Sequence, residues 1–244
     1  MNGGYKSGLQ ATPWNTWDIV KAVVVAVAVV ALVFGVAVIV PLVLGADFHG
    51  RAGTVFLAAV TGLAEAALLL AAWMFSVHKY KVGWLALGFR RFRGLPDLVT
   101  ALGVVGLFFL VNWVYAIIIL LLGLKFLLPE QSVPTFGGGL LGLLLTLAVA
   151  AIVAPLAEEA FFRGFVFGGL RGRVRLAWAA AFSAGLFAIS HLQISVVIPI
   201  FVLGLLLAWL YYQTSSLWSC IFAHALYNGT ALVISFVITS RGGL

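Results

Sequence analysis

The chain alternates between long runs of apolar residues and short polar or basic stretches. One helix needs about 20 consecutive apolar residues to cross the hydrocarbon core of a bilayer. Because the apolar runs approach or exceed this length, the pattern predicts an all-α, polytopic transmembrane helix bundle of about seven spans, within a range of six to eight. The expected spans are residues 22–46, 54–77, 98–124, 138–168, 176–192, 196–212 and 217–239.

Composition supports the same class of protein. Of the 244 residues, 64% are hydrophobic and only 9% are Asp, Glu, Lys or Arg, whereas soluble domains carry about 25% charged residues. These values exclude a soluble enzyme and a nucleic-acid binder, and they make the lipid bilayer the expected surroundings. The single cysteine, Cys220, excludes an intrachain disulfide.

Basic residues gather in alternate connections between the expected spans. Short loops rich in Lys and Arg lie preferentially on the cytoplasmic side of the membrane. The pattern therefore predicts an integral membrane protein with a cytoplasmic N-terminus. The connections after the second and fourth spans hold Lys79, Lys81, Arg90, Arg91, Arg93, Arg171, Arg173 and Arg175, whereas those after the first and third hold only Arg51 and Lys125.

Three charged residues interrupt the fourth apolar helix. Each charge inside a span opposes insertion by about 2.5 to 3.5 kcal/mol, so compensation is required. Glu159 and Arg163 are four residues apart and face the same side of a helix, which predicts a structural ion pair. Glu158 points about 100° away from that pair. A carboxylate in this position is a candidate general base.

Two later spans carry imidazoles at similar spacing. Phe187 precedes His191 by four residues, and His224 precedes Asn228 by four residues. These residues are compatible with two mechanisms. With a metal such as Zn²⁺, His191 and His224 would be ligands, with a glutamate such as Glu158 as a further ligand or as the base. Without a metal, Glu158 would activate water, while the imidazoles and the Asn228 amide would bind the oxyanion.

These residues together resemble the three-motif signature of the CPBP intramembrane proteases, the family that includes the Rce1-type CAAX prenyl endopeptidases and the bacterial Abi proteins. The resemblance covers about residues 138–235. It implies Glu158 as the water-activating base, a structural pair of Glu159 with Arg163, and substrate, oxyanion or metal contacts from the remaining three residues. The three motifs are Glu158-Glu159-Ala-Phe-Phe-Arg163, Phe187-x-x-x-His191 and His224-x-x-x-Asn228.

The resemblance implies an intramembrane endopeptidase, of metallo type if zinc is bound, that hydrolyses a membrane-associated protein or peptide. We expect one membrane domain over residues 1–244, with N-terminal spans and loops in 1–137 and a catalytic core in 138–239. The last four helices of this core would enclose a hydrophilic cavity open to the cytoplasm. The size of the chain suits a prokaryotic plasma membrane protein. The alternatives are a proton-coupled transporter that uses Glu65, Glu158 and the histidines, and a catalytically idle scaffold of the same family.

The heights of the candidate residues in the membrane differ. At 1.5 Å per residue, Glu158 lies about 18 Å from the cytoplasmic end of its helix, His224 about 10 Å and His191 about 25 Å. Straight, parallel helices would keep these side chains apart. A kink at Pro155 or a tilt of the helices is therefore expected if they form one site.

Overall fold

A computed structural model describes residues 11–45, 50–128, 136–137 and 139–241, and within these ranges the regular elements are all helical. Six helical segments are long and apolar enough to cross a membrane. A seventh, α7, is apolar but has only 15 residues. The predicted all-α polytopic bundle is therefore confirmed. The elements are α1 (Thr16–Leu44), α2 (Gly50–Trp73), η1 (Met74–His78), η2 (Trp84–Leu87), α3 (Leu95–Leu121), η3 (Lys125–Leu127), α4 (Gly139–Ala148), η4 (Val149–Val153), α5 (Ala154–Glu158), η5 (Glu159–Phe167), α6 (Gly168–Leu170), α7 (Leu176–Ser190), α8 (Ile194–Thr214) and α9 (Leu217–Arg241).

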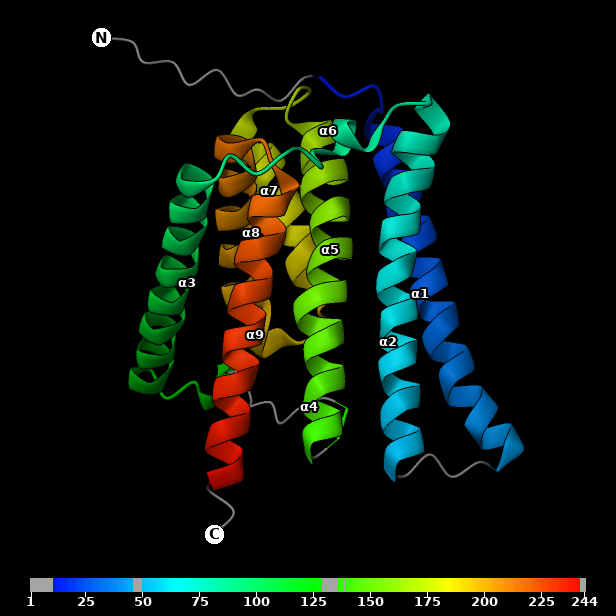
Figure 1. Ribbon diagram of the computed structural model, residues 1–244, viewed down its shortest axis with the longest axis vertical. Coiled ribbons are helices and arrows are strands. Elements are labelled where there is room, and N and C mark those ends of the chain that lie inside the picture. Colours follow the sequence, from blue (N-terminus) through cyan, green and yellow to red (C-terminus); the bar gives the residue numbers. More distant parts are fainter. Residues whose placement is uncertain (1–10, 46–49, 129–135, 138, 242–244) are drawn as a thin grey trace.

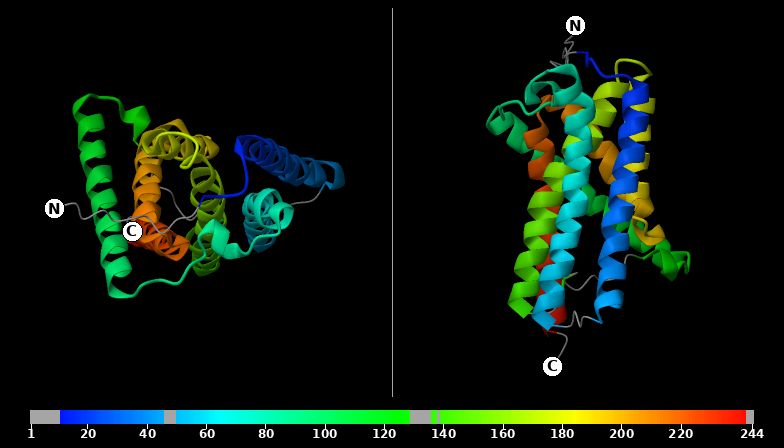
Figure 2. Two further views of the ribbon diagram at one scale, coloured as in Figure 1. Left: turned by 90° about the horizontal axis from the view of Figure 1, so that it is seen from above. Right: turned by 90° about the vertical axis from the view of Figure 1, so that its right-hand side faces the viewer.

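The elements α4 to α6 form one continuous helix, Gly139–Leu170, in the middle of the bundle. The expected start of this helix at residue 138 lies outside the described residues. The helix packs between α2 on one side and α9 on the other, while α7 and α8 lie against each other beside it. Seen from above in Figure 2, α3 and the α1–α2 pair lie on opposite sides of this central group. The candidate residues of the first and third motifs are therefore carried by neighbouring helices (Figure 1).

The first helix is fixed at the end where it enters the bundle. Asn15 and Asp18 form a reciprocal capping box, which satisfies amides that have no partner inside the helix. Asp18 also accepts hydrogen bonds from Lys79 and Tyr80, which follow the extension of α2. These contacts tie the start of α1 to the end of the α2 segment.

Trp14 connects the N-terminal segment to the central helix. Its side chain is fully buried, and its indole Nε1–H donates a hydrogen bond of 2.9 Å to the carbonyl oxygen of Phe165. The two rings also stack, with centroids 5.6 Å apart. A Cβ atom at Gly169 would lie 2.6 Å from Trp14 Nε1, so this close approach depends on the missing side chain of the glycine.

Candidate active site

The central helix departs from α-helical geometry on both sides of α5. The segments η4 and η5 are π-helical, and the Ala154 amide donates to the carbonyl oxygen of Val149, five residues earlier. Such wide turns are frequent at functional sites because they change the direction in which side chains point. Glu158 is the last residue of α5, and Glu159 is the first residue of η5. The two carboxylates therefore lie where the helical register changes.

Asn228 supports this irregular region from α9. In the π register, the amide that would donate to the carbonyl of Ala150 belongs to residue 155, which is proline and has no N–H. The side-chain Nδ2 of Asn228 donates to this carbonyl oxygen at 2.8 Å. Asn228 thus satisfies a backbone carbonyl near Pro155, and its side-chain amide is engaged in that hydrogen bond in this structure.

A buried polar cluster is centred on the carboxylate of Glu159. Its Oε1 atom accepts a hydrogen bond of 2.9 Å from Arg163 Nη1 and another of 2.9 Å from Nδ1 of His224. Glu159 and Arg163 are fully buried, and His224 is 2% exposed. The Arg163 guanidinium also lies 4.2 Å from the centre of the Phe187 ring, a cation–π contact. The expected ion pair is thus extended by an imidazole from α9.

Glu158 differs from its neighbour in its surroundings. Its Oε2 atom lies 3.7 Å from Nε2 of His224, a longer contact than either of those made by Glu159. Its side chain is 11% exposed, whereas that of Glu159 is completely covered. Glu158 is therefore less completely covered than Glu159 and makes only the longer contact with the imidazole. Because the Glu159 carboxylate can only accept, His224 donates from Nδ1, and Nε2 faces Glu158.

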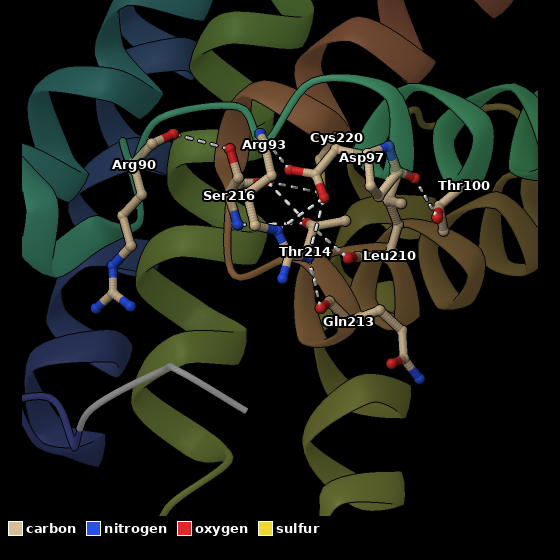
Figure 3. A network of polar contacts seen from close by, with 10 residues as sticks. Arg90, Arg93, Asp97, Thr100, Leu210, Gln213, Thr214, Ser216 and Cys220 are labelled. Atoms are coloured by element: carbon tan, nitrogen blue, oxygen red, sulfur yellow. Dashed lines mark hydrogen bonds and ion pairs between the residues drawn. The ribbon is translucent and has the colours of Figure 1, made fainter. Parts of the chain in front are cut away.

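The start of α9, which determines the position of His224, is anchored by the polar network shown in Figure 3. Ser216 Oγ donates to the carbonyl oxygen of Arg90 at 2.9 Å. Arg93 binds the Asp97 carboxylate at 3.0 Å through Nε and the carbonyl oxygen of Gln213 at 3.2 Å through Nη2. The segment before α3 therefore holds the turn between α8 and α9 in place.

His191 is not brought into this cluster. It follows the last residue of α7, is exposed, and donates from Nδ1 to the carbonyl oxygen of Phe187 at 2.8 Å. The Phe187 ring contacts both imidazoles edge to face, with centroid distances of 4.9 Å to His191 and 5.7 Å to His224. The ring of Phe187 is thus in contact with both imidazoles.

A carboxylate outside the three motifs also belongs to these surroundings. Glu65 lies near the middle of α2, which packs against α5, the element that carries Glu158. A carboxylate in the middle of an apolar span is an unusual feature that the sequence displays. Its partner cannot be read from the sequence, because the partner depends on how α2 packs against α5.

The donor atoms of His191, His224 and Glu158 are chemically suited to zinc. Among the residues that the structure describes, however, no group of three or more His, Cys, Asp or Glu side chains is placed to hold a metal ion. His191 in particular lies at the end of α7, with Nδ1 on a backbone carbonyl. We therefore derive no chemical step through a metal.

The fold and this cluster define a polytopic helical membrane protein with a buried glutamate and histidine site. Residues 140–230 match the model of the family described as type II CAAX prenyl endopeptidase, Rce1-like. The resemblance drawn from the three motifs is thus confirmed as a similarity: residues 140–230, rather more than a third of the chain, are similar to the Rce1-like family.

A curated relative is consistent with this similarity. It bears the name "Putative membrane peptidase YdiL", from Bacillus subtilis (strain 168), and is 31% identical over 90 residues. The aligned region spans 37% of this chain and 37% of the relative, so the comparison covers about a third of either protein. No solved structure matches the chain.

Proposed function

We propose that this protein is an intramembrane endopeptidase that hydrolyses a peptide bond of a membrane-associated protein or peptide, with Glu158 as the base that activates water. One observation carries the proposal. Of the two adjacent carboxylates, Glu159 is fully covered and bonded to Arg163 and His224, whereas the Glu158 side chain is 11% exposed and faces Nε2 of the same imidazole.

The chemistry follows from these positions. The Glu158 carboxylate accepts a proton from a water molecule, and the water oxygen forms a bond to the carbonyl carbon of the peptide. The resulting oxyanion needs a nearby donor, and a protonated Nε2 of His224 would supply one. When the C–N bond breaks, the proton held by Glu158 passes to the leaving amine. The net reaction adds one water across one peptide bond.

The cation at Arg163 has a separate role in this proposal. Its partner Glu159 fixes Nδ1 of His224, so the ion pair orients the imidazole instead of acting on the substrate. The hydrophilic space that admits peptide and water would lie beside Glu158, between α2, α5 and α9, which pack around this residue. We further propose that this space opens to the cytoplasm.

A peptidase assay tests the assignment of the base. Purified wild type, Glu158→Gln and Thr146→Val would be incubated in detergent micelles with a proteome-derived peptide library, and new termini would be identified by mass spectrometry. Thr146 is a matched control because it lies on the same helix and its hydroxyl donates to the carbonyl of Gly142, within its own helix. We expect cleavage by the wild type and the control, and none by Glu158→Gln. Full turnover by Glu158→Gln would show that another group is the base.

A metal assay addresses the zinc hypothesis with the same library. We expect a chelator to leave cleavage by the wild type unchanged, because the candidate ligands do not converge. Elemental analysis of the purified protein would accompany the assay. Loss of activity with chelator and its recovery with zinc would instead favour the metal-dependent mechanism, with His191 moved toward His224.

A further inference from the structure

Residues 79–94 connect the α2–η1 span to α3, and we call this connection the basic segment. It lies outside the three motifs and outside residues 140–230, which the family model matches. It holds five Lys or Arg residues and no Asp or Glu. In Figure 1 it crosses the end of the bundle at which the connection between α6 and α7 also lies. Because it joins two membrane spans, it places this positive charge at the level of the lipid headgroups.

The cations of the basic segment differ in how far acidic neighbours compensate them. Lys79 forms an ion pair with Asp18, and Arg93 forms one with Asp97. Arg91 is exposed, and its guanidinium forms no hydrogen bond or ion pair with the residues that the structure describes. Each Lys or Arg at a membrane surface contributes about 1 kcal/mol to the attraction of anionic lipid. Arg91 is therefore a candidate contact for a lipid phosphate.

A surface pocket lies beside this guanidinium. It has a volume of about 380 Å³ and is lined by Arg91, Phe92, Arg93 and Gly94. This volume is within the range of small-molecule sites, roughly 300 to 1,000 Å³. Guanidinium groups suit phosphate, because their N–H donors form a planar fork that matches its oxygens. Asp97 offsets the charge of Arg93, so Arg91 gives the pocket its net positive charge.

Exposed apolar side chains flank these cations. Trp84 is 42% exposed, Leu85 is 63% exposed, and Leu95, at the start of α3, is 71% exposed. Water does not suit these apolar side chains, and hydrocarbon does not suit the guanidinium of Arg91. The boundary between headgroups and acyl chains suits both kinds of group. The surroundings of the pocket therefore favour a lipid over an anion that is dissolved in water.

The basic segment is bonded to the start of α9, the helix that carries His224. The amide of Leu217 donates to the carbonyl oxygen of Gly88 at 2.8 Å. The hydroxyl of Ser216 donates to the carbonyl oxygen of Arg90 at 2.9 Å (Figure 3). Two successive residues at the start of α9 are thus held by the backbone of the basic segment.

The pocket itself also contacts α9 and the end of α8. The ring of Phe92 meets that of Phe222 edge to face, with centroids 6.4 Å apart. Phe222 precedes His224 by two residues on α9. Arg93 donates from Nη2 to the carbonyl oxygen of Gln213, at the end of α8. A ligand that restrains residues 91–94 would therefore also restrain the part of α9 that leads to His224.

We propose that the pocket at residues 91–94 binds the phosphate group of an anionic phospholipid, and that this lipid stabilises the start of α9 and the position of His224. The lipid site itself does not depend on peptidase activity, whereas its effect on catalysis rests on the proposed function. No bond is made or broken at this site, so the lipid acts as an effector.

Native mass spectrometry of the purified protein in a neutral detergent tests the lipid site. Phosphatidylglycerol is the anionic probe, and phosphatidylcholine is the probe without net charge. We expect the wild type to prefer phosphatidylglycerol, and Arg91→Gln to bind it about fivefold more weakly. Arg175→Gln is the matched control, because Arg175 is an exposed cation at the same end of the bundle and does not line the pocket. Its affinity should stay within about twofold of the wild type.

Hydrogen exchange measures the coupling to α9 without any substrate. Phosphatidylglycerol at about ten times its Kd should slow exchange of the amides of residues 217–222 by up to about tenfold in the wild type, because it stabilises the closed state. At the same lipid concentration, the weaker affinity of Arg91→Gln should reduce this slowing to about threefold. Arg175→Gln should behave as the wild type does.

Kinetics in lipid nanodiscs test the effect on catalysis. A peptide that the wild type cleaves would be offered in nanodiscs of phosphatidylcholine, with and without phosphatidylglycerol. We expect phosphatidylglycerol to raise kcat of the wild type about fivefold. The rise should be retained in Arg175→Gln and reduced in Arg91→Gln.

Three results would overturn the lipid site. The first is equal binding of the two lipids. The second is equal weakening in Arg91→Gln and Arg175→Gln, which would indicate diffuse attraction to this end of the bundle. The third is displacement of the lipid by an equal concentration of inorganic phosphate or of an acidic peptide, which would indicate a soluble ligand.

The coupling to His224 has its own contrary outcomes. Exchange of residues 217–222 that does not respond to lipid, or equal kcat of the wild type in both nanodiscs, would overturn it. A wild type that binds the lipid and shows slower exchange but cleaves no peptide would reject the proposed peptidase activity and leave the lipid site intact.

Discussion

The Nδ1 atom of His224 lies 2.9 Å from Oε1 of Glu159, a contact between residues 65 positions apart in the chain. It links the helix of the first motif to the helix of the third. Because Nδ1 is engaged with Glu159, the opposite nitrogen of the same ring faces Glu158 at 3.7 Å. Adjacent glutamates thus meet opposite sides of one imidazole, which separates an orienting carboxylate from a reactive one.

This geometry predicts different effects for two substitutions of His224. The side-chain amide of His224→Asn occupies roughly the position of Nδ1, so it keeps a donor for Glu159 and lacks the atom that faces Glu158. We expect a folded protein whose peptide cleavage is about 100-fold slower. His224→Leu lacks both nitrogens and should also unfold more readily. Thermal unfolding and kcat measured side by side check this, and wild-type turnover by His224→Asn would contradict a role for Nε2.

The buried cation at Arg163 should be important for stability. Among the described residues, Arg163→Met would leave the Glu159 carboxylate with His224 as its only hydrogen-bond partner, and it would remove the cation–π contact to Phe187. We expect the free energy of unfolding to fall by about 3 to 5 kcal/mol. Denaturant titration in mixed micelles would measure the change. The double variant with Glu159→Gln should recover part of the loss, and a double variant less stable than Arg163→Met would argue against an uncompensated charge as the cause.

The contact of Asn228 with the Ala150 carbonyl predicts coupling to Pro155. Asn228→Leu should lower the free energy of unfolding by about 0.5 to 1.5 kcal/mol, because it removes a hydrogen bond to a half-buried carbonyl oxygen. In the background of Pro155→Ala, residue 155 has an N–H that can donate to the same carbonyl, so the loss should be smaller. A double-mutant cycle in micelles measures this difference. Equal losses in both backgrounds would show that the amide and Pro155 act independently.

Two glycines provide a matched test of the Trp14 contact. A Cβ atom at Gly169 would meet the Trp14 indole at 2.6 Å, whereas nothing lies within 4 Å of a Cβ atom at Gly172. We expect Gly169→Ala to lower the free energy of unfolding by about 1 to 3 kcal/mol, and Gly172→Ala to change it by less than about 0.5 kcal/mol. Tryptophan fluorescence during unfolding would report both values. Similar stability of the two variants would mean that the N-terminal segment moves aside at little cost.

Much of the bundle could be predicted from the sequence because membrane helices are marked by uninterrupted apolar runs. The pairing of Glu159 with Arg163 could also be anticipated, since residues four apart share a helix face. The neighbour of Glu65 could not, because it depends on the packing of α2 against the central helix. The contact between Glu158 and His224 requires departures from straight, parallel helices, and the π-helical segments beside α5 are not evident in a hydropathy pattern.

The 15 residues of α7 also have a consequence for the surrounding lipid. A helix of this length spans about 22 Å, less than the roughly 30 Å of a typical hydrocarbon core. Figure 1 shows the turn between α7 and α8 well above the lower ends of α2 and α9. At this turn His191 and Gln193 are exposed. The adjoining helix α8 has 21 residues and matches the core, so the mismatch is confined to α7. Local thinning of the lipid beside α7 would match its length, which makes bilayer thickness a variable that acts on the neighbourhood of His191.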